Sequence, residues 1–297
     1  MGVEVLSRKL NSDNGLPDNN VRHIVQDAKG FIWMGTPNGL YRFDGYFFTT
    51  YKYSETGNAR LLNNNHIQAL YTLPDNRLLI AEQGHQFSVF DIEENRFVEL
   101  PEKEKELLYD GCRKKDLDPK VEQRFRNVID NGGGIISDNL GNNVVIDNTG
   151  QLWFIDRQTG ETIQMRVFDE DLFPLVSSKK FKVVTSQRRQ LIWVSTNGCG
   201  ITVYDRKEKT VKHIRQDSGL IASDYIIDMC LDCDDNVWVA DEFHGLEYLI
   251  PAENNMTVRL LNQHAKGLRD NQVYVMRWLA DSTLLIANTK GDVYKTD

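Results

Sequence analysis

The chain has 297 residues, of which 40% are hydrophobic and 10% aromatic, a composition that can fill a large core and excludes a low-complexity disordered chain. Its formal net charge of −8 argues against a general binder of nucleic acid or of anionic membranes. No apolar run approaches the roughly 18–20 residues of a membrane span, and Met1–Asn14 lacks the apolar core of a signal peptide. We expect a cytosolic protein or a mature or excised piece of a longer chain.

The segment from Gly15 to Tyr51 predicts four short strands. Each is apolar or β-branched and ends at a turn signal; they are Val21–Gln26, Phe31–Gly35, Leu40–Phe43 and Phe47–Tyr51. In the first hairpin, the Asp27 side chain can bond the turn backbone, and Gly30 tolerates a positive φ. Trp33 offers a large flat face on a central strand, which can fill the wedge between two stacked sheets.

Copies of this pattern follow along the chain. Positions equivalent to Trp33 are Leu79, Val144, Trp193, Trp238 and Leu285, and in the third of these copies Trp153 falls on the third strand. Because no single copy can bury both of its faces, a ring of stacked sheets is the consistent arrangement. We therefore predict an all-β protein, a single β-propeller over residues 1–297 with six four-stranded blades.

The longest step between copies has roughly 19 extra residues, too few for a whole blade. This excess falls in Pro101–Asn131, a charged insertion that includes Glu102–Glu106 and Arg113–Lys115. We expect a solvated loop with a short helix; the alternatives are a docking surface and an irregular seventh blade.

The two ends of the sequence complement each other. The last copy stops at a third strand, Gly291–Lys295, and the segment Val3–Leu10 precedes the first copy where a fourth strand would lie. Pairing of these segments would close the ring and remove exposed sheet edges. The alternative is a chain cut partway through a longer array.

The cysteines give little indication of chemistry. Cys230 and Cys233 form a lone CxxC on a predicted strand, where an offset of three directs the side chains to opposite faces. Metal binding usually requires a second pair or nearby histidines. We predict small buried or half-buried residues here, with no metal and no cofactor.

The first copy resembles the two-component regulator propeller repeat. It carries Asp27-x-x-Gly30-x-x-Trp33-x-Gly35-Thr36-x-x-Gly39-Leu40-x-x-x-Asp44, preceded by GLPDNNV from Gly15. Such repeats are similar to those of periplasmic sensor regions in hybrid two-component systems, best known from Bacteroidetes. The resemblance implies a periplasmic location, detection of glycan fragments, and further domains, a membrane helix and a kinase outside this sequence. It identifies the chain as part of a longer sensor, which meets the membrane only through such other segments.

In a four-stranded blade, the loops between blades and those between the second and third strands open on one face, the usual ligand mouth. These loops are rich in amides, histidines and aromatic rings, which suit sugars. The candidate ligand-binding residues are Asn20, Asn38, Asn65, His66, Gln83, His85, Asn197, Asp224, Tyr225, Glu242, His244, Asn271, Gln272 and Lys290. The alternative for each is a plain turn residue that bonds local backbone.

Three functions remain open from the sequence. A non-catalytic sensor of a small molecule or oligosaccharide predicts a polar and aromatic mouth, and it could also contact a second copy of itself. A protein-interaction scaffold predicts apolar patches on the rim. A carbohydrate-active enzyme would need paired carboxylates or a His or Tyr base, but no spacing fixes a pair. The residues that could be considered for it are Glu82, Asp241, Glu242 and His244. We expect no catalytic residue and no nucleic-acid partner.

Overall fold

The computed structural model describes residues 7–54, 62–73, 76–84, 86–99, 134–140, 142–146, 149–156, 159–168, 178–251, 272–280, 282–288 and 292–296. These residues form antiparallel sheets of three or four strands, with two short 3-10 turns at Ser12–Asn14 and Gln216–Ser218. By internal contacts the chain divides into two compact units. The terminal unit comprises residues 4–106 and 265–297, and the central unit residues 1–3 and 107–264.

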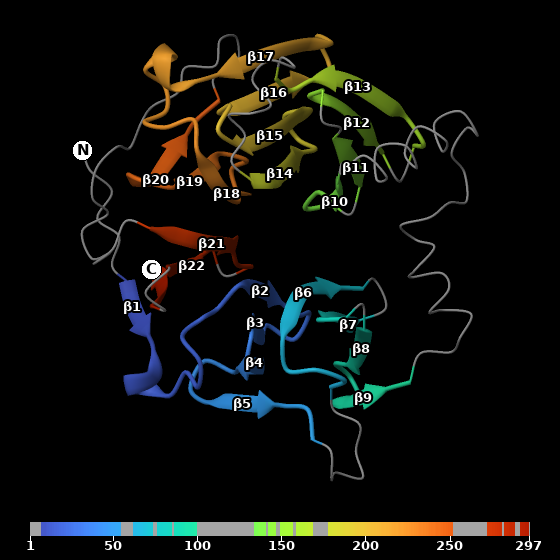
Figure 1. Ribbon diagram of the computed structural model, residues 1–297, viewed down its shortest axis with the longest axis vertical. Helices are drawn as coiled ribbons and strands as arrows, with labels where there is room; N and C mark the ends of the chain where they lie inside the picture. The colour runs from blue at the N-terminus through green and yellow to red at the C-terminus, as the bar shows by residue number, and fades with distance from the viewer. Residues whose placement is uncertain are drawn as a thin grey trace. The chain divides into compact units, whose positions relative to one another are not determined.

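The terminal unit contains three four-stranded sheets (Figure 1). The first has the order β1 (Ser7–Leu10), β23 (Val293–Thr296), β22 (Leu284–Asn288), β21 (Val273–Trp278). The second consists of β2 (His23–Gln26), β3 (Ile32–Thr36), β4 (Gly39–Phe43) and β5 (Phe48–Tyr51). The third consists of β6 (Ile67–Thr72), β7 (Arg77–Glu82), β8 (Gln86–Asp91) and β9 (Arg96–Val98).

The pairing expected between the two ends of the sequence is present. Strand β1 runs antiparallel to β23, with Leu10 opposite Val293 and Ser7 opposite Thr296. The N-terminal segment therefore supplies the fourth strand of a sheet whose other three strands come from the C-terminus. Both Leu10 and Val293 are buried, so the pairing also contributes to the core.

The central unit contains the other three sheets (Figure 1). One consists of β10 (Gly134–Ser137), β11 (Asn143–Ile146), β12 (Gln151–Ile155) and β13 (Thr162–Arg166). The next consists of β14 (Ser178–Ser186), β15 (Leu191–Asn197), β16 (Ile201–Asp205) and β17 (Thr210–Ile214). Within the described ranges the last has three strands, β18 (Ile226–Leu231), β19 (Val237–Asp241) and β20 (Gly245–Leu249). Trp153 lies on the third strand of its sheet, as predicted.

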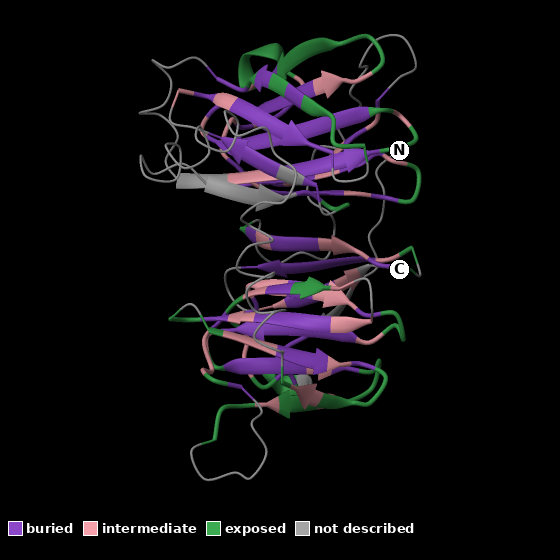
Figure 2. Ribbon diagram, turned by 90° about the vertical axis from the view of Figure 1, so that its right-hand side faces the viewer, coloured by how far each residue is buried: buried purple, intermediate pink, exposed green. Residues whose placement is uncertain are grey.

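The core lies between neighbouring sheets, and the tryptophans mark it. Trp33 packs in one cluster with Ile80 and Phe90 of the next sheet, and Trp193 packs with Val239 of its own next sheet. The same repeat position thus fills the same kind of interface in both units. Figure 2 shows buried residues along the strands and exposed residues mainly in the connecting turns.

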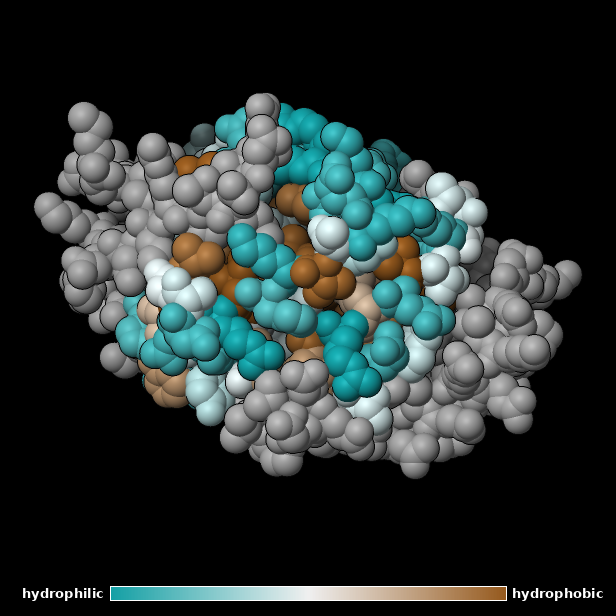
Figure 3. All heavy atoms as spheres, turned by 90° about the horizontal axis from the view of Figure 1, so that it is seen from above, coloured by the Kyte–Doolittle hydropathy of each residue, from teal (hydrophilic) through white to brown (hydrophobic). Residues whose placement is uncertain are grey.

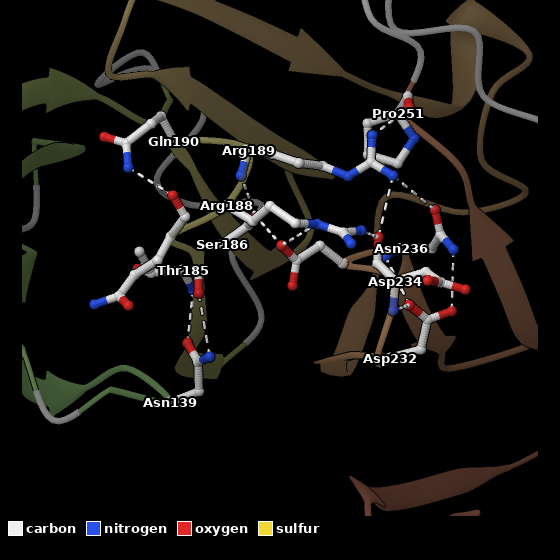
Figure 4. Close-up of polar contacts among 12 residues, drawn as sticks. Asn139, Thr185, Ser186, Arg188, Arg189, Gln190, Asp232, Asp234, Asn236 and Pro251 are labelled. Atoms are coloured by element: carbon white, nitrogen blue, oxygen red, sulfur yellow. Dashed lines mark hydrogen bonds and ion pairs between the residues drawn. The ribbon is translucent and has the colours of Figure 1, made fainter. Parts of the chain in front are cut away.

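Hydrogen bonds between neighbouring first hairpins reinforce this stacking in the central unit (Figure 4). Asn139 bonds the backbone of Thr185 in both directions, with Oδ1 accepting at 2.6 Å and Nδ2 donating at 3.2 Å. Arg189 donates to the carbonyls of Asp234 and Pro251 at 3.1 and 2.8 Å. The adjacent sheets are therefore joined by side-chain bonds at these turns as well as by apolar packing.

Some details differ from the sequence predictions. Strand β2 begins at His23 rather than Val21, because Val21 belongs to a turn in which its own N–H bonds the carbonyl of Asn19. Cys230 lies buried on β18, but Cys233 lies in the following turn and is exposed, because the strand ends at Leu231. The insertion Pro101–Asn131 lies outside the described residues.

Among the described residues, no helix has the length and apolar character needed to cross a membrane.

Strand β17 forms an outer strand of the central unit, and Thr210–His213 are exposed on it. The described atoms on the face seen in Figure 3 are a mixture of hydrophilic and hydrophobic residues.

Candidate functional site

One repeat position organises the ends of the sheets where the candidate residues lie. It is the last residue of the second strand or its equivalent, three residues beyond the Trp33 position, and it is buried and polar in five copies: Thr36, Glu82, Thr196, Asp241 and Asn288. Thr196 Oγ1, for example, accepts from Cys199 N at 2.9 Å and donates to the Gly200 carbonyl at 3.3 Å. These side chains hold the turns and loops that carry the candidate residues.

In the terminal unit, Asn20 and Asn38 lie around Asp18. Asn38 Nδ2 donates to Asp18 Oδ2 at 2.9 Å, and Asn20 N donates to Asp18 Oδ1 at 2.9 Å. Thr36 Oγ1 in turn accepts from Asn38 N at 3.0 Å. The structure therefore brings this pair together at an exposed loop, with local bonds already made.

A second group surrounds Glu82. Its Oε2 accepts from Asn64 N at 2.6 Å, and Gln83 N donates to the His66 carbonyl at 2.9 Å. Asn65 Oδ1 accepts from Tyr53 N at 2.7 Å. Asn65 thus bonds the backbone of its own loop. Burial raises the pKa of Glu82, since desolvation outweighs the bonds it accepts.

In the central unit, three loops converge at the junction between sheets β14–β17 and β18–β20. Asp224 lies in the loop ahead of β18, and its carbonyl accepts from Gly198 N and Gly200 N, each at 2.9 Å. The next residue, Tyr225, forms an isolated antiparallel bridge with Asn197. Tyr225 also accepts, through its carbonyl, from Glu242 N at 2.9 Å. The backbones of Asn197, Asp224, Tyr225 and Glu242 are therefore held together at this junction.

Phe243 completes this junction with an exposed aromatic ring. Phe243 is 58% exposed. Its ring meets the Tyr225 ring edge-on, with ring centroids 5.7 Å apart. His244 follows at 6.4 Å from the Phe243 ring. Sequence reasoning missed Phe243 because it occurs in one copy only, although it lies in the same turn as Glu242 and His244. We call the group Asn197, Asp224, Tyr225, Phe243 and His244 the junction cluster.

Two buried carboxylates support the junction cluster from below. Asp241 Oδ1 accepts from Phe243 N at 2.7 Å and from His244 N at 2.6 Å, and His244 Nδ1 lies 3.2 Å away. Glu247 on β20 accepts from Ala222 N at 2.7 Å through Oε1. The pKa of Glu247 is raised to about 7, first by burial and also by the negative charge of Asp241, while the Ala222 bond and His244 oppose the rise.

Four further candidates lie outside the described residues or at another sheet. His85, Asn271 and Lys290 lie outside the described residues, and Gln272 is exposed just ahead of β21. Within the described ranges, no group of three or more His, Cys, Asp or Glu is placed to hold a metal ion. The geometry suits contact with a polar ligand that has a flat apolar face, because the exposed Phe243 ring stands beside Tyr225 and next to backbone groups that hydrogen bonds hold in place.

Residues 15–38 match the family model described as "Two component regulator propeller". This propeller repeat covers the hairpin of β2 and β3 and the turn that carries Asn38. No curated protein matches the chain.

Solved structures resemble the chain in fold. The extracellular domain of BT4673 from B. thetaiotaomicron, described as a hybrid two component system, has a TM-score of 0.64 and 16% identity over 100% of this chain and 43% of its own length. The extracellular domain of BT3049 from the same organism has a TM-score of 0.52 and 19% identity, over 99% of this chain and 42% of its own length. A structure described as YCF48 bound to D1 peptide has a TM-score of 0.58 and 10% identity, over 98% of this chain and 96% of its own length. The chain therefore spans less than half of either extracellular domain.

Proposed function

We propose that the chain is the propeller part of the extracellular or periplasmic sensor region of a two-component-type receptor, and that its junction cluster binds an oligosaccharide without cleaving it. The observation that carries this proposal is the exposed Phe243 ring, which meets the Tyr225 ring edge-on. The turn that carries Phe243 is fixed by the hydrogen bond from Phe243 N to Asp241 Oδ1. A sugar ring presents a flat apolar face to such rings and hydroxyls to amides and carboxylates.

The match of residues 15–38 to the propeller repeat supports a sensor role. The fold shared with extracellular domains of proteins described as hybrid two component systems is consistent with it. Glu242 is partly exposed beside the aromatic pair, where its carboxylate could meet hydroxyl groups. Because hydrogen bonds already fix these turns in the ligand-free chain, binding would cost little free energy for ordering them.

A thermal-shift screen against neutral, acidic and amino-sugar oligosaccharides tests this proposal, because a ligand that binds only the folded state raises the melting temperature. We expect at least one oligosaccharide to stabilise the chain and Phe243→Ala to abolish the shift. Phe47→Ala, which removes an even more exposed ring from the β4–β5 turn, should leave the shift unchanged. Analysis of the recovered sugar should show it intact. Failure of the whole panel, or cleaved sugar, would contradict the proposal.

A protein-interaction role is the second candidate, and it rests on the β4–β5 turn. Tyr46 and Phe47 are 84% and 76% exposed there, on a turn held by Asp44. Two adjacent exposed rings are a typical anchor for a protein partner or a second copy of the chain. Sedimentation velocity of the parent chain and of the double variant Tyr46→Ser, Phe47→Ser distinguishes this: self-association lost in the variant supports it, and a monomer in both cases argues against a second copy as the partner.

A further inference from the structure

Two buried carboxylate oxygens beneath the junction cluster lack a partner among the described residues. They are Asp241 Oδ2 and Glu247 Oε2. Asp241 is 0% exposed and Glu247 1% exposed, so water does not reach either carboxylate from the surface. A buried charged oxygen without a bond is costly, and a site that leaves two of them side by side needs an explanation.

The strand register places both carboxylates on one face of the sheet. Asp241 pairs with Gly245, and Glu247 lies two residues further along β20, opposite Val239. Side chains two residues apart on a strand point to the same face, and diagonal neighbours of this kind are within reach of long side chains. The two acids are therefore neighbours that face the adjacent sheet together.

We propose that Asp241 and Glu247 share a single proton, that this proton holds the loops of the junction cluster in place, and that its loss to solvent weakens ligand binding there. The last part of this inference rests on the proposed function, whereas the first two parts do not. One O–H bond, from Glu247 Oε2 toward Asp241 Oδ2, would satisfy both unpartnered oxygens. When the proton dissociates to water, two buried like charges remain and repel each other.

The other oxygens of the pair explain why the loops would respond. Glu247 Oε1 holds Ala222 N, three residues before Tyr225, and Asp241 Oδ1 holds the turn that carries Phe243. Glu242 N then ties this turn to the Tyr225 carbonyl. Any displacement of the two carboxylates moves both sides of the aromatic pair.

The charges around the pair favour this behaviour. Asp241 opposes ionisation of Glu247, and His244, on the β19–β20 turn, favours it. On the adjacent sheet, Trp193, Ile201 and Val203 belong to the apolar cluster that packs against β19 and β20. Lys182 on β14 and Asp228 on β18 form a charged pair between these two sheets and neutralise each other at 2.9 Å. The raised pKa of Glu247, about 7, is consistent with a proton held through the mildly acidic range.

Urea unfolding of the ligand-free chain between pH 5 and pH 8 tests the shared proton. Because the pKa of Glu247 is higher in the folded chain than its ordinary value, folding binds a proton and stability falls as pH rises through this range. We expect the parent's folding equilibrium constant to fall about fiftyfold more than that of Glu247→Gln. The glutamine amide keeps an acceptor for Ala222 N and a permanent donor for Asp241. Glu208→Gln, a neutralised exposed acid on another turn, should follow the parent.

Asp241→Asn gives an independent measurement that does not depend on Glu247→Gln folding well. Removal of the neighbouring charge should confine the pH-dependent loss of stability to lower pH and reduce its size, because the pKa of Glu247 falls toward its ordinary value. This combination appears as a flatter curve that lies above the parent's at pH 8. Equal pH profiles for the parent, Glu247→Gln and Asp241→Asn would overturn the shared proton.

Titration with the most stabilising oligosaccharide at pH 6 and pH 8 tests the link to binding. We expect affinity to be about tenfold weaker at pH 8 in the parent and equal at both pH values in Glu247→Gln. Equal affinities in the parent would overturn the link and leave the proposed function standing. A pH-dependent stability with no oligosaccharide bound at either pH would instead contradict the proposed function and leave the shared proton standing.

Discussion

The indole Nε1 of Trp33 donates to Asp27 Oδ2 at 2.7 Å within the core. The same aspartate accepts from Lys29 N and Phe31 N through Oδ1, at 2.9 and 3.0 Å. The two most distinctive residues of the repeat are therefore one unit, in which the turn residue also satisfies the buried ring. A buried donor left without this acceptor costs free energy.

We predict that Asp27→Ala lowers the free energy of unfolding by about 2–4 kcal/mol, because three donors lose a charged acceptor and one of them is buried. Chemical denaturation monitored by tryptophan fluorescence measures the change. The matched control is Gln187→Ala, at the same position of another copy, where the residue is exposed. Its effect should stay within about 0.5 kcal/mol. Equal losses in the two variants would contradict the role given to Asp27.

Gly200 and Gly219 have nearly the same φ but different surroundings, so their alanine variants distinguish backbone strain from steric contact. Gly200 has φ +71°, and an added Cβ would lie 2.4 Å from the Ile214 carbonyl oxygen, whereas Gly219 has φ +68° and open space around it. Gly219→Ala should cost about 1 kcal/mol from the left-handed backbone alone. Gly200→Ala should cost at least about 2 kcal/mol more, because the β16–β17 edge has to shift. Similar melting temperatures for both variants would show that the turn yields easily.

The Glu82 carboxylate is predicted to anchor the loop ahead of β6. Glu82→Ala leaves Asn64 N without its acceptor and should cost about 1–3 kcal/mol. Glu82→Gln keeps an acceptor and removes a buried charge whose pKa is raised, so it should remove part of the stability loss that the parent shows as pH rises. Urea titrations at pH 5 and pH 8 measure both effects. A parent-like pH dependence in the glutamine variant would show that Glu82 does not titrate in this range.

Strand β1 should be required for the stability of the terminal unit. A chain that begins at residue 11 lacks the β1 partner of β23 and the buried Leu10 side chain, and it leaves β23 as an open edge. We expect a lower melting temperature and concentration-dependent association by light scattering. Leu10→Ala, which keeps the strand, should cost about 2–4 kcal/mol without association. A truncated chain as stable as the parent would contradict the structural role of this pairing.

The repeated strand pairs could be predicted from sequence because their spacing and turn residues are regular. Trp33 and Trp193 fill equivalent interfaces, and β1 pairs with β23 as the complementary ends implied. The buried polar position at the end of the second strand was missed, because Thr36, Glu82 and Asp241 share a place but not a residue type. Each serves by accepting a backbone N–H, which several side chains can do equally well.

Glu247, the buried acid that supports the junction cluster, was also not identified from the sequence. Glu247 occupies a third-strand position that holds Tyr41, Ser88 and Thr202 in other copies. A charged residue that alternates with apolar ones on a strand normally indicates the solvent face. Here the face of the sheet that carries Glu247 packs against sheet β14–β17, so the alternation gives the wrong side, and only the stacked arrangement shows that Glu247 is buried.

Hydrogen–deuterium exchange of the chain with and without its most stabilising oligosaccharide tests the central claim most directly, because it locates the binding surface. The account predicts slower exchange in three segments, residues 197–200, 222–225 and 241–245, and no change at the β4–β5 turn. Protection confined to other loops, or absent with every oligosaccharide tried, would contradict the assignment of the junction cluster as the ligand site.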